Sequence, residues 1–464
     1  MRLWKRICSA LLFLGLGLTL FGCAEVNQDN GPTTQPPTLQ ERYDAAAQAL
    51  QNAENLVLRY TVKQTRTVGS NQFIHTVTGN ASYAQQGSAS MTAIVEENLR
   101  YGSYEVDYEE IYCGGSAYVQ FDGKCFDAEL SADAFLNRQI PAVLAQSSLY
   151  VQIEELPNED GTSLIFRQPQ GPESWAAVPA GAIVQEAWAM ATLDSSDVLT
   201  ASSYYVRYLL GGVQYIYEAT MQAAAPKVLD LTGRHPEHFP NSVPLEDLNV
   251  PKLLLKAVGD VYSAEYMTSR AEEKTYSEAI PVTYIQESAF SVSGWGDSLS
   301  AEAAYKVTVS DYREEVSVTT QTERFQESKF TTQRNDETPQ ENPAVTAEMM
   351  RQHCEDAILS AVLAPKYLAA AKSETVDGVQ KLTFRGNTAF VTDLMSNIGQ
   401  FLQVDLGAQA QSSTLDAAEG YLHLDVETGL PVAMGLKLSC RHTIDGVVYS
   451  LTYDLTQTLD LIGK

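Results

Sequence analysis

The side chain whose sequence context best suits nucleophilic catalysis is Ser298, within the segment from Gly296 to Ser300 that reads Gly-Asp-Ser-Leu-Ser. A serine hydroxyl becomes a nucleophile when a histidine, itself oriented by a carboxylate, accepts its proton. The chain has six histidines, and none of them stands three residues after an aspartate. Glycine, aspartate and serine are also common turn residues, so we expect a loop between antiparallel strands here.

The same segment resembles the nucleophile block of the GDSL-type esterases. That resemblance implies a catalytic serine at Ser298, an Asp-x-x-His pair near the C-terminus and a place at the start of a parallel α/β domain. This chain has neither the pair nor the place. We therefore predict a protein that is not an enzyme, with an esterase or a glycan hydrolase as the remote alternative.

Three side chains that can bind metals, His235, Glu237 and His238, lie close together in the sequence. Their spacing matches neither of the common zinc-protease patterns, and Pro236 restricts how they can turn toward one another. We predict a solvated linker there, with no metal site and no cofactor. The histidines that stand alone are expected to be surface residues or satisfied core residues: His75, His353, His423 and His442.

Adjacent acidic residues occur at Glu109-Glu110 and at Glu314-Glu315. A pair of carboxylates supports acid–base catalysis only if both groups reach one substrate. Neighbouring residues of a strand face opposite sides of its sheet, so we interpret both pairs as parts of a solvated rim.

Tyrosine is abundant, with 24 residues in the chain. Two groups fall on predicted strands: Tyr101, Tyr104, Tyr108, Tyr112 and Tyr118, and then Tyr204, Tyr205, Tyr208, Tyr215 and Tyr217. Amphipathic rings suit a groove that accepts lipid, glycan or peptide. Tyrosine is also a favourable strand residue, so the ligand-binding residues stay unassigned.

The N-terminus predicts where the protein is located. Arg2, Lys5 and Arg6 precede a mostly apolar run over residues 7–20, which is typical of a signal peptide at residues 1–22. A membrane-spanning helix needs about 20 apolar residues, so this run is too short to be one. The export signal ends at Cys23.

Residues 20–23, Leu-Phe-Gly-Cys, resemble the lipobox of bacterial lipoproteins. The resemblance implies that Cys23 is acylated, becomes the mature N-terminus and anchors the protein at the extracytoplasmic face of the cell membrane, or at the outer membrane if the cell has two. Two acyl chains hold a protein stably without a basic patch. A plain signal peptide with an incidental cysteine is the alternative.

The composition limits the partners further. Residues 23–37 are polar and rich in proline, so we predict a flexible tether, which reaches about 40 Å when extended. The formal net charge of −27 repels nucleic acid and anionic lipid head groups. We predict no nucleic-acid partner, a membrane contact through the lipid anchor, and a folded part that the charge keeps away from the membrane.

Apart from Cys8 and Cys23, the cysteines are Cys113, Cys125, Cys354 and Cys440. Four cysteines allow three pairings, and the sequence leaves open the pairs 113–125 and 354–440. Buried thiols are the default expectation, because cysteine packs as a small apolar residue. The chain has no Cys-x-x-Cys motif, which disfavours a zinc ribbon or a thioredoxin-like site.

The two halves of the chain repeat three features in the same order. Each half has a helical stretch, then a Leu-x-Phe-Arg strand, then a Gly-Val hairpin, at residues 132–145, 160–167 and 212–217 and at residues 347–364, 377–385 and 446–451. Such a repeat predicts a tandem duplication. We expect domains at 38–226 and 251–464, joined by a linker at 227–250 that is rich in proline.

Local patterns indicate the elements of each half. A capping box from Thr38 to Glu41 and the proline Pro251 mark the start of a helix in each half. Alternation of apolar and acidic residues from Tyr104 to Glu109 indicates a strand with one buried face. Glycine pairs such as Gly114-Gly115 and Gly211-Gly212 indicate hairpins. The predicted fold class is α+β: two tandem incomplete β-barrels, each a twisted antiparallel meander covered by a few helices.

A lipobox, a polar tether, an opening amphipathic helix and a long meander interrupted by helices together resemble the lipoprotein-carrier superfamily, meaning the LolA/LolB type and its mycobacterial lipid-binding relatives. The resemblance covers residues 38–464 as two copies. It implies an incomplete barrel closed by helices around an apolar cavity for acyl chains. The leading hypothesis is a lipid-anchored protein that binds a lipid or an acylated protein. The alternative is an envelope scaffold whose cores are filled, and an apolar cavity of several hundred cubic ångströms would separate the two.

Overall fold

The computed structural model describes residues 36–462 except for 86–90, 103, 122, 140–143, 145–146, 159–160, 170–177, 226–228, 278–281, 295–297, 311–315, 359–367, 387–411 and 445. The predicted signal peptide, Cys23 and most of the predicted tether therefore lie outside the described residues. The chain divides into two compact units, residues 1–38 and residues 39–464. The second unit contains both large sheets, and its description follows.

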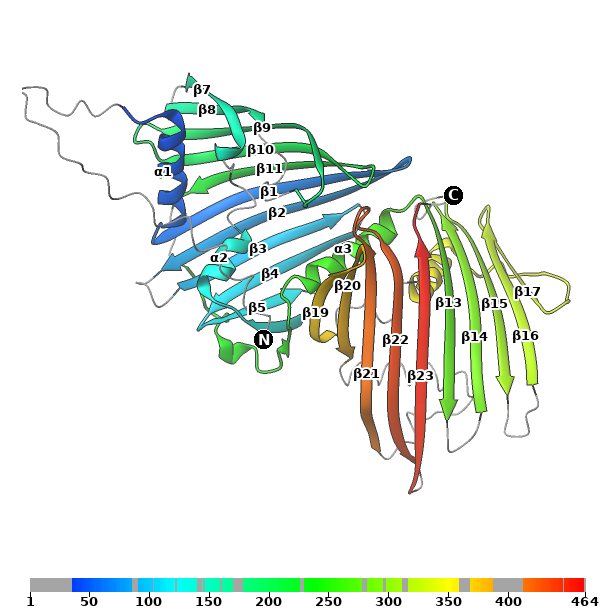
Figure 1. The fold of residues 1–464 in the computed structure, drawn as a ribbon. Coiled ribbons are helices and arrows are strands. Elements are labelled where there is room, and N and C mark those ends of the chain that lie inside the picture. The colour runs from blue at the N-terminus through cyan, green and yellow to red at the C-terminus, as the bar shows by residue number, and fades with distance from the viewer. Residues whose placement is uncertain are drawn as a thin grey trace, which may run out of the picture. The chain divides into compact units, whose positions relative to one another are not determined.

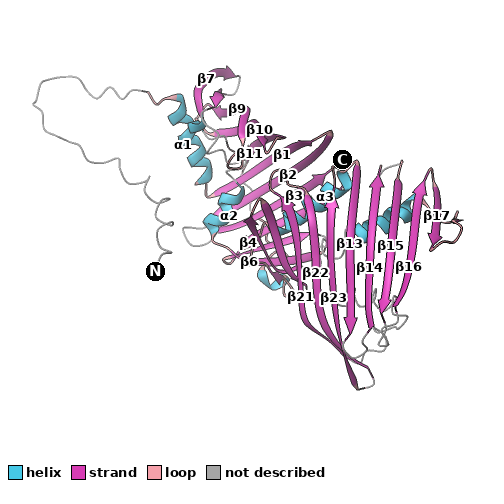
Figure 2. Ribbon diagram, turned by 45° about the vertical axis from the view of Figure 1, so that its right-hand side comes forward, coloured by secondary structure: helices cyan, strands magenta, loops and turns pink. Residues whose placement is uncertain are grey.

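Long antiparallel strands dominate this unit, with short helices between groups of strands (Figures 1 and 2). The α-helices in the described part are α1 (Leu39–Gln51), α2 (Ala132–Gln139), α3 (Val250–Ser263) and α4 (Ala347–Ile358). The strands of the first sheet are β1 (Asn55–Val68), β2 (Asn71–Gln85), β3 (Met91–Tyr101), β4 (Tyr104–Cys113), β5 (Ser116–Phe121), β6 (Lys124–Glu129), β7 (Tyr150–Asn158), β8 (Gly161–Pro169), β9 (Ile183–Asp194), β10 (Leu199–Leu210), β11 (Val213–Ala224) and β12 (Val243–Pro244). Those of the second sheet are β13 (Tyr266–Ser277), β14 (Val282–Ser293), β15 (Ser300–Ser310), β16 (Val316–Gln326), β17 (Lys329–Arg334), β18 (Gln340–Glu341), β19 (Leu368–Val376), β20 (Val379–Gly386), β21 (Ser412–Asp425), β22 (Pro431–Ile444) and β23 (Val447–Asp460).

Both sheets are open and follow the same strand order. The first runs β12-β6-β5-β4-β3-β2-β1-β11-β10-β9-β8-β7, and the second runs β18-β17-β16-β15-β14-β13-β23-β22-β21-β20-β19. In each sheet the first and last long strands meet at the centre, where β1 pairs with β11 and β13 pairs with β23. Neighbouring strands are antiparallel, except that the short β12 pairs in parallel with β6. The described part is mostly strand with few helices, which broadly fits the predicted α+β class, and the two sheets of 12 and 11 strands are not closed barrels.

The segments that repeat in the sequence lie at corresponding places in the two sheets. Residues 161–167 lie in β8, and residues 379–385 lie in β20. The Gly-Val pairs at 212 and 446 begin β11 and β23, the strands that pair with the first strand of each sheet. The range 227–250, expected to be a linker, contributes β12 to the edge of the first sheet.

A glycine allows three strands of the first sheet to place polar groups side by side. Tyr60 of β1 pairs with Gly79 of β2, and Gly79 pairs with Glu97 of β3. A Cβ atom at Gly79 would lie 2.4 Å from the Tyr60 ring, so only glycine leaves room for that ring. The ring covers the glycine and brings the Tyr60 hydroxyl to Glu97 Oε1, to which it donates a hydrogen bond of 2.7 Å.

The helices cover the inner, apolar faces of the sheets. Tyr43 of α1 packs edge-on against Phe166 of β8, with 4.9 Å between ring centroids. In the second sheet, α4 contributes the buried Met350 and contacts β14. The helix α3 contacts strands of both sheets, β2 to β4 in the first and β19 in the second. Among the helices that the structure describes, none combines the length and the hydropathy needed to cross a bilayer.

Candidate functional site

The residues that suggested catalysis do not converge. Ser298 lies in an exposed turn between β14 and β15, as expected for a loop, and Leu299 beside it is buried. His235 precedes a short 3-10 helix at Pro236–His238, and His238 ends it; both histidines are exposed, and their ring centroids are 6.3 Å apart. Within the described residues, no group of three or more His, Cys, Asp or Glu side chains is placed to hold a metal ion.

The cysteines in the described part are all thiols, which agrees with the expectation that none of them forms a disulfide. Cys113 is buried on the outer face of the first sheet with Ile111 and Phe239, and Cys125 packs against the same cluster. Burial raises the pKa of Cys125 to about 11, and burial also raises that of Cys440 to about 11. Neither group is therefore an activated nucleophile, because the thiolate is the reactive form.

One interpretation of the acidic pairs is wrong. Glu109 and Glu110 do face opposite sides of β4, but Glu110 is fully buried instead of forming a solvated rim. Glu109 is on the other face, where its carboxylate pairs with Arg234 at 2.6 Å. Glu314-Glu315 lies outside the described residues. The buried position of Glu110 identifies a polar region inside the first sheet that the sequence analysis did not find.

One partner of Glu110, Lys252, comes from α3. This helix reads VPKLLLKAVGDVYS, and its charged residues, Lys252, Lys256 and Asp260, are spaced by four. Residues at this spacing lie on one face of a helix. Gly259 lets that helix approach β3 closely, since a Cβ atom there would lie 2.0 Å from Cβ of Tyr101. The three charged residues are thereby held against the inner face of the first sheet.

Asp260 is the centre of one half of this network. Its Oδ1 atom lies 2.6 Å from Nη2 of Arg66 and 2.7 Å from Nε2 of His75, and its Oδ2 atom lies 3.5 Å from Nζ of Lys256. Burial alone would raise the pKa of Asp260, but Lys256, Arg66 and His75 outweigh it and hold that pKa well below its usual range. Asp260 is thus a buried carboxylate that stays ionised.

Lys252 is the centre of the other half. Its Nζ atom lies 2.5 Å from Oε2 of Glu97 and 3.4 Å from Oε1 of Glu110, and it sits 4.9 Å from the ring centroid of Tyr108. Arg138 of α2 also reaches Glu110, at 3.4 Å. Burial would lower the pKa of Lys252, but the two glutamates outweigh burial and raise it above its usual value.

The network also joins the first sheet to the β21–β22 turn of the second. Arg66 donates a 2.5 Å hydrogen bond from Nη1 to the carbonyl of Thr428, and Lys256 donates one of 3.0 Å to the carbonyl of Gly429. The hydroxyl of Tyr215 donates to the carbonyl of Glu427. One set of buried charges therefore fixes α3, the first sheet and a turn of the second sheet together. The network therefore has a structural role, because a buried ionised group is stable in the fold only while its partner is present.

His75 makes the stability of this network depend on pH. Burial is the main cause that lowers the pKa of His75 to about 4; Asp260 opposes the shift, while Lys256 and Arg66 add to it. The histidine is therefore neutral in the folded protein at pH 7, and its ring packs edge-on against Tyr101 at 5.0 Å. As the pH falls from about 6.5 toward 4, the unfolded chain binds a proton at His75 before the folded protein does, so stability is lost over that window.

We expect His75→Gln to remove this dependence. Between pH 7 and pH 4, the variant should lose about 3 kcal/mol less of its free energy of unfolding than the natural protein, because glutamine does not titrate. Urea unfolding followed by tyrosine fluorescence across this pH range measures the difference. The exposed His238 supplies a control, and His238→Gln should keep the pH dependence of the natural protein. Equal pH profiles for His75→Gln and the natural protein would contradict the assignment.

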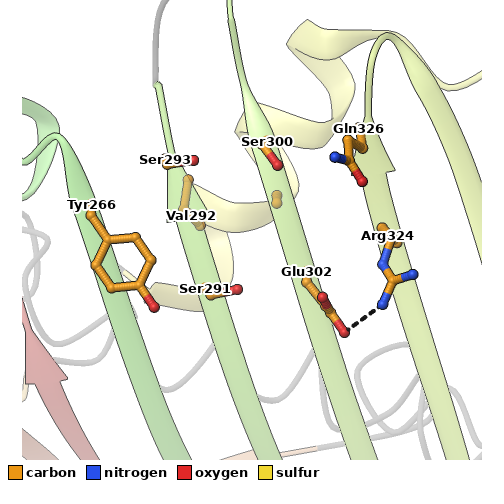
Figure 3. A pocket seen from close by; sticks show the side chains of 9 residues that line it. Tyr266, Ser291, Val292, Ser293, Ser300, Glu302, Arg324 and Gln326 are labelled. Carbon is orange, nitrogen blue, oxygen red and sulfur yellow. Dashed lines mark hydrogen bonds and ion pairs between the residues drawn. The ribbon is translucent and has the colours of Figure 1, made fainter. Parts of the chain in front are cut away.

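A polar pocket of about 180 Å³ lies on the second sheet, over strands β13 to β16 (Figure 3). Its lining side chains include Ser291, Ser293 and Ser300, and an ion pair in which Arg324 Nη2 lies 3.0 Å from Glu302 Oε1. Pockets for small organic ligands usually measure about 300–1,000 Å³ and are mostly apolar. This one suits water or a small polar group and is unlike a cavity for acyl chains.

The tyrosines that suggested a groove lie mostly in the core of the first sheet. Tyr101, Tyr108, Tyr112, Tyr208 and Tyr215 are all buried. The rings of Tyr208 and Tyr215 stack with centroids 5.0 Å apart, and those of Tyr204 and Tyr217 meet edge-on with centroids 5.8 Å apart. Their role as strand and core residues is therefore visible in the structure.

No protein-family model matches this sequence, and a comparison with curated proteins gives no match either. LprF from Mycobacterium bovis is similar over 46% of this chain and 92% of its own, at 10% identity and a TM-score of 0.26. A DUF1329 family protein from Desulfovibrio piger aligns over 42% of this chain and 96% of its own, at 8% identity and a TM-score of 0.17. A putative AttH from Nitrosomonas europaea aligns over 87% and 92%, at 10% identity and a TM-score of 0.14. Similarity this low leaves the function to be argued from the residues of this chain.

Proposed function

We propose that this chain is a non-enzymatic lipoprotein, exported and anchored through acylated Cys23 at the extracytoplasmic face of a bacterial membrane, and that its second sheet binds a lipid or another apolar or amphipathic molecule. The basic residues, the apolar run and the cysteine at the N-terminus support export and anchoring. We also propose that residues 38–226 and 251–464 are two copies of one domain, which the shared strand order supports.

The observation that carries ligand binding is the change of burial along the inner face of β15. Ala301 and Ala303 are buried, whereas Val307 and Val309, which alternation puts on the same face, are only half-buried. On the neighbouring β14, Phe290 is buried beside α4 and Tyr284 is half-buried. This stretch of apolar inner face, away from α4, is a surface that an acyl chain can cover.

The proposal that the protein is not an enzyme has a separate basis. Ser298 lies in a turn, and the side chains that line the polar pocket beside it are serines, an ion pair, a tyrosine, a glutamine and small apolar residues. A serine nucleophile needs a base within hydrogen-bond reach. In the second sheet, His353 lies 3.0 Å from Glu323 on the inner side, where α4 packs, and not beside Ser298.

A scaffold function is the second candidate, and the first sheet favours it. The inner face of that sheet is filled by α1 and by the charged face of α3, whose partners Glu97 and Glu110 are buried. A face filled in this way does not accept an acyl chain. If the second sheet also binds nothing, the protein would act through its outer surfaces.

The substitution Val307→Asp tests ligand binding. Protein purified without its lipid anchor and extracted with organic solvent should yield lipid, and the variant should yield about tenfold less, since a carboxylate in an apolar site weakens binding by at least about 1.4 kcal/mol. Mass spectrometry of the extract measures the difference. Thr308→Asp is the matched control, because Thr308 faces the other side of β15 beside the exposed Val318. A clean extract from the natural protein would favour the scaffold.

A further inference from the structure

The outer face of the first sheet carries an apolar patch formed by residues from three neighbouring strands. Trp188 of β9 pairs with Tyr205 of β10, and their rings stack with centroids 5.6 Å apart. Met190 stands two residues along β9 on the same face and pairs with Ile165 of β8. We name these four residues the Trp188 patch. Trp188 is 40% exposed and Met190 38% exposed, so a single continuous apolar surface faces solvent.

The charges around the Trp188 patch are paired, although the chain as a whole is strongly acidic. Arg207 Nη2 lies 3.1 Å from Glu186 Oε2 on one side, and Arg167 Nε lies 3.6 Å from Glu154 Oε2 on the other. Each pair is neutral as a unit. The net charge of −27 is therefore concentrated elsewhere, and this part of the surface lacks the repulsion from anionic lipid that the composition predicts for the whole chain.

The N-terminal tether joins the folded part at α1, which contacts the first sheet at one end of β9. Arg42 in the first turn of α1 bonds Glu155 of β7 at 2.9 Å and Asp197, in the β9–β10 turn, at 2.7 Å. From Asp194 to Trp188, β9 rises by about 20 Å at roughly 3.3 Å per residue. Residues 24–38 between Cys23 and α1 can extend to about 45 Å at roughly 3.1 Å per residue. A lipid held at Cys23 is thus within reach of the patch.

We propose that the Trp188 patch rests on the surface of the bilayer that holds the acyl chains of Cys23, an inference that depends on the proposed lipidation. Tryptophan and tyrosine favour the interface between head groups and acyl chains, and methionine and isoleucine add apolar area there. A patch of four residues binds a membrane weakly by itself. The tether raises the effective concentration of the bilayer to about millimolar, which makes a weak contact sufficient. The contact holds the first sheet against the membrane by its outer face, opposite α1 and α3.

Quenching of Trp188 by brominated lipid tests this orientation. The mature chain keeps Trp175, Trp188 and Trp295, so replacing Trp175 and Trp295 with phenylalanine leaves Trp188 as the reporter. The full-length acylated protein is reconstituted in vesicles of phosphatidylcholine and phosphatidylglycerol, with or without bromine on the acyl chains, and flotation is measured on the same sample. We expect flotation, a blue-shifted spectrum and quenching by about twofold or more in brominated vesicles.

Matched variants separate the patch from the anchor. Met190→Glu should keep flotation and lose most of the quenching, whereas Val318→Glu, at an exposed valine on the outer face of the second sheet, should keep both. Circular dichroism checks that each variant is folded. Flotation of the reporter protein without quenching overturns the patch proposal and leaves the lipidation intact. Failure to float overturns both. If quenching is absent and the protein forms dimers in the vesicles, the patch binds a second copy of the chain. That outcome also overturns the proposal.

Discussion

Replacing Asp260 with alanine is expected to lower the free energy of unfolding by about 3–5 kcal/mol, because it leaves the buried Arg66 and the partly buried Lys256 without their counter-ion. Asp260 is fully buried, and its carboxylate lies 2.6 Å from Arg66 and 3.5 Å from Lys256. The same change removes the hydrogen-bond partner of His75. Since Arg66 and Lys256 also bond the carbonyls of Thr428 and Gly429, the attachment of the β21–β22 turn should weaken with it.

Chemical unfolding of the natural protein and of the variant at pH 7 measures this effect. Asp416 provides the matched control, because its carboxylate also bonds an arginine, Arg441, but on the exposed surface. Asp416→Ala should change the unfolding midpoint little, as exposed ion pairs contribute little to stability. If Asp260→Ala lost less than about 1 kcal/mol, the network would not be a structural centre.

Replacing Cys23 with serine is expected to move the protein from the membrane fraction to the soluble fraction almost completely. Each buried methylene of an acyl chain contributes about 0.8 kcal/mol to membrane attachment, and serine offers no thiol for acylation. The remaining attraction would be weak, because anionic lipid head groups repel a chain with a net charge of −27. Fractionation of cells that express the natural protein and the variant gives the comparison.

Mass spectrometry of the purified protein supplies the direct observation. The natural protein should begin at Cys23 and carry the mass of its acyl groups, and Cys8→Ser should behave in the same way, because Cys8 lies in the apolar run of the signal. An unmodified thiol at Cys23 in the natural protein would refute the anchor, and with it the membrane orientation inferred for the Trp188 patch.

Local features of the fold were readable in the sequence because their causes are local. The capping box beginning at Thr38 precedes α1, and Pro251 lies in the first turn of α3. The glycines at 114 and 211 take positive φ angles in the turns that join β4 to β5 and β10 to β11. These features depend on a few neighbouring residues, so short patterns predict them.

The candidate site was much harder to predict from the sequence, because it depends on contacts between distant residues. Nothing near Arg66 indicates that it meets Asp260, 194 positions later in the chain. The helix α3 was expected to serve only the second half, yet its charged face packs on the first sheet. One signal was available: charged residues at every fourth position of an otherwise apolar helix predict a polar strip that needs buried partners.

The pairing of β1 with β11, and of β13 with β23, has a consequence for how the chain folds. The centre of the first sheet can form only after Thr220 is available to pair with Thr61. The centre of the second can form only after Gln457 is available to pair with Ala271. Contacts this distant in sequence slow folding, and an unpaired central strand can meanwhile associate with other chains. Lys252 of α3 is made only after β11, so Glu97 and Glu110 lack this counter-ion while the strands of the first sheet are being synthesised. We therefore expect the inner face of the first sheet to pack fully only after α3 has been made.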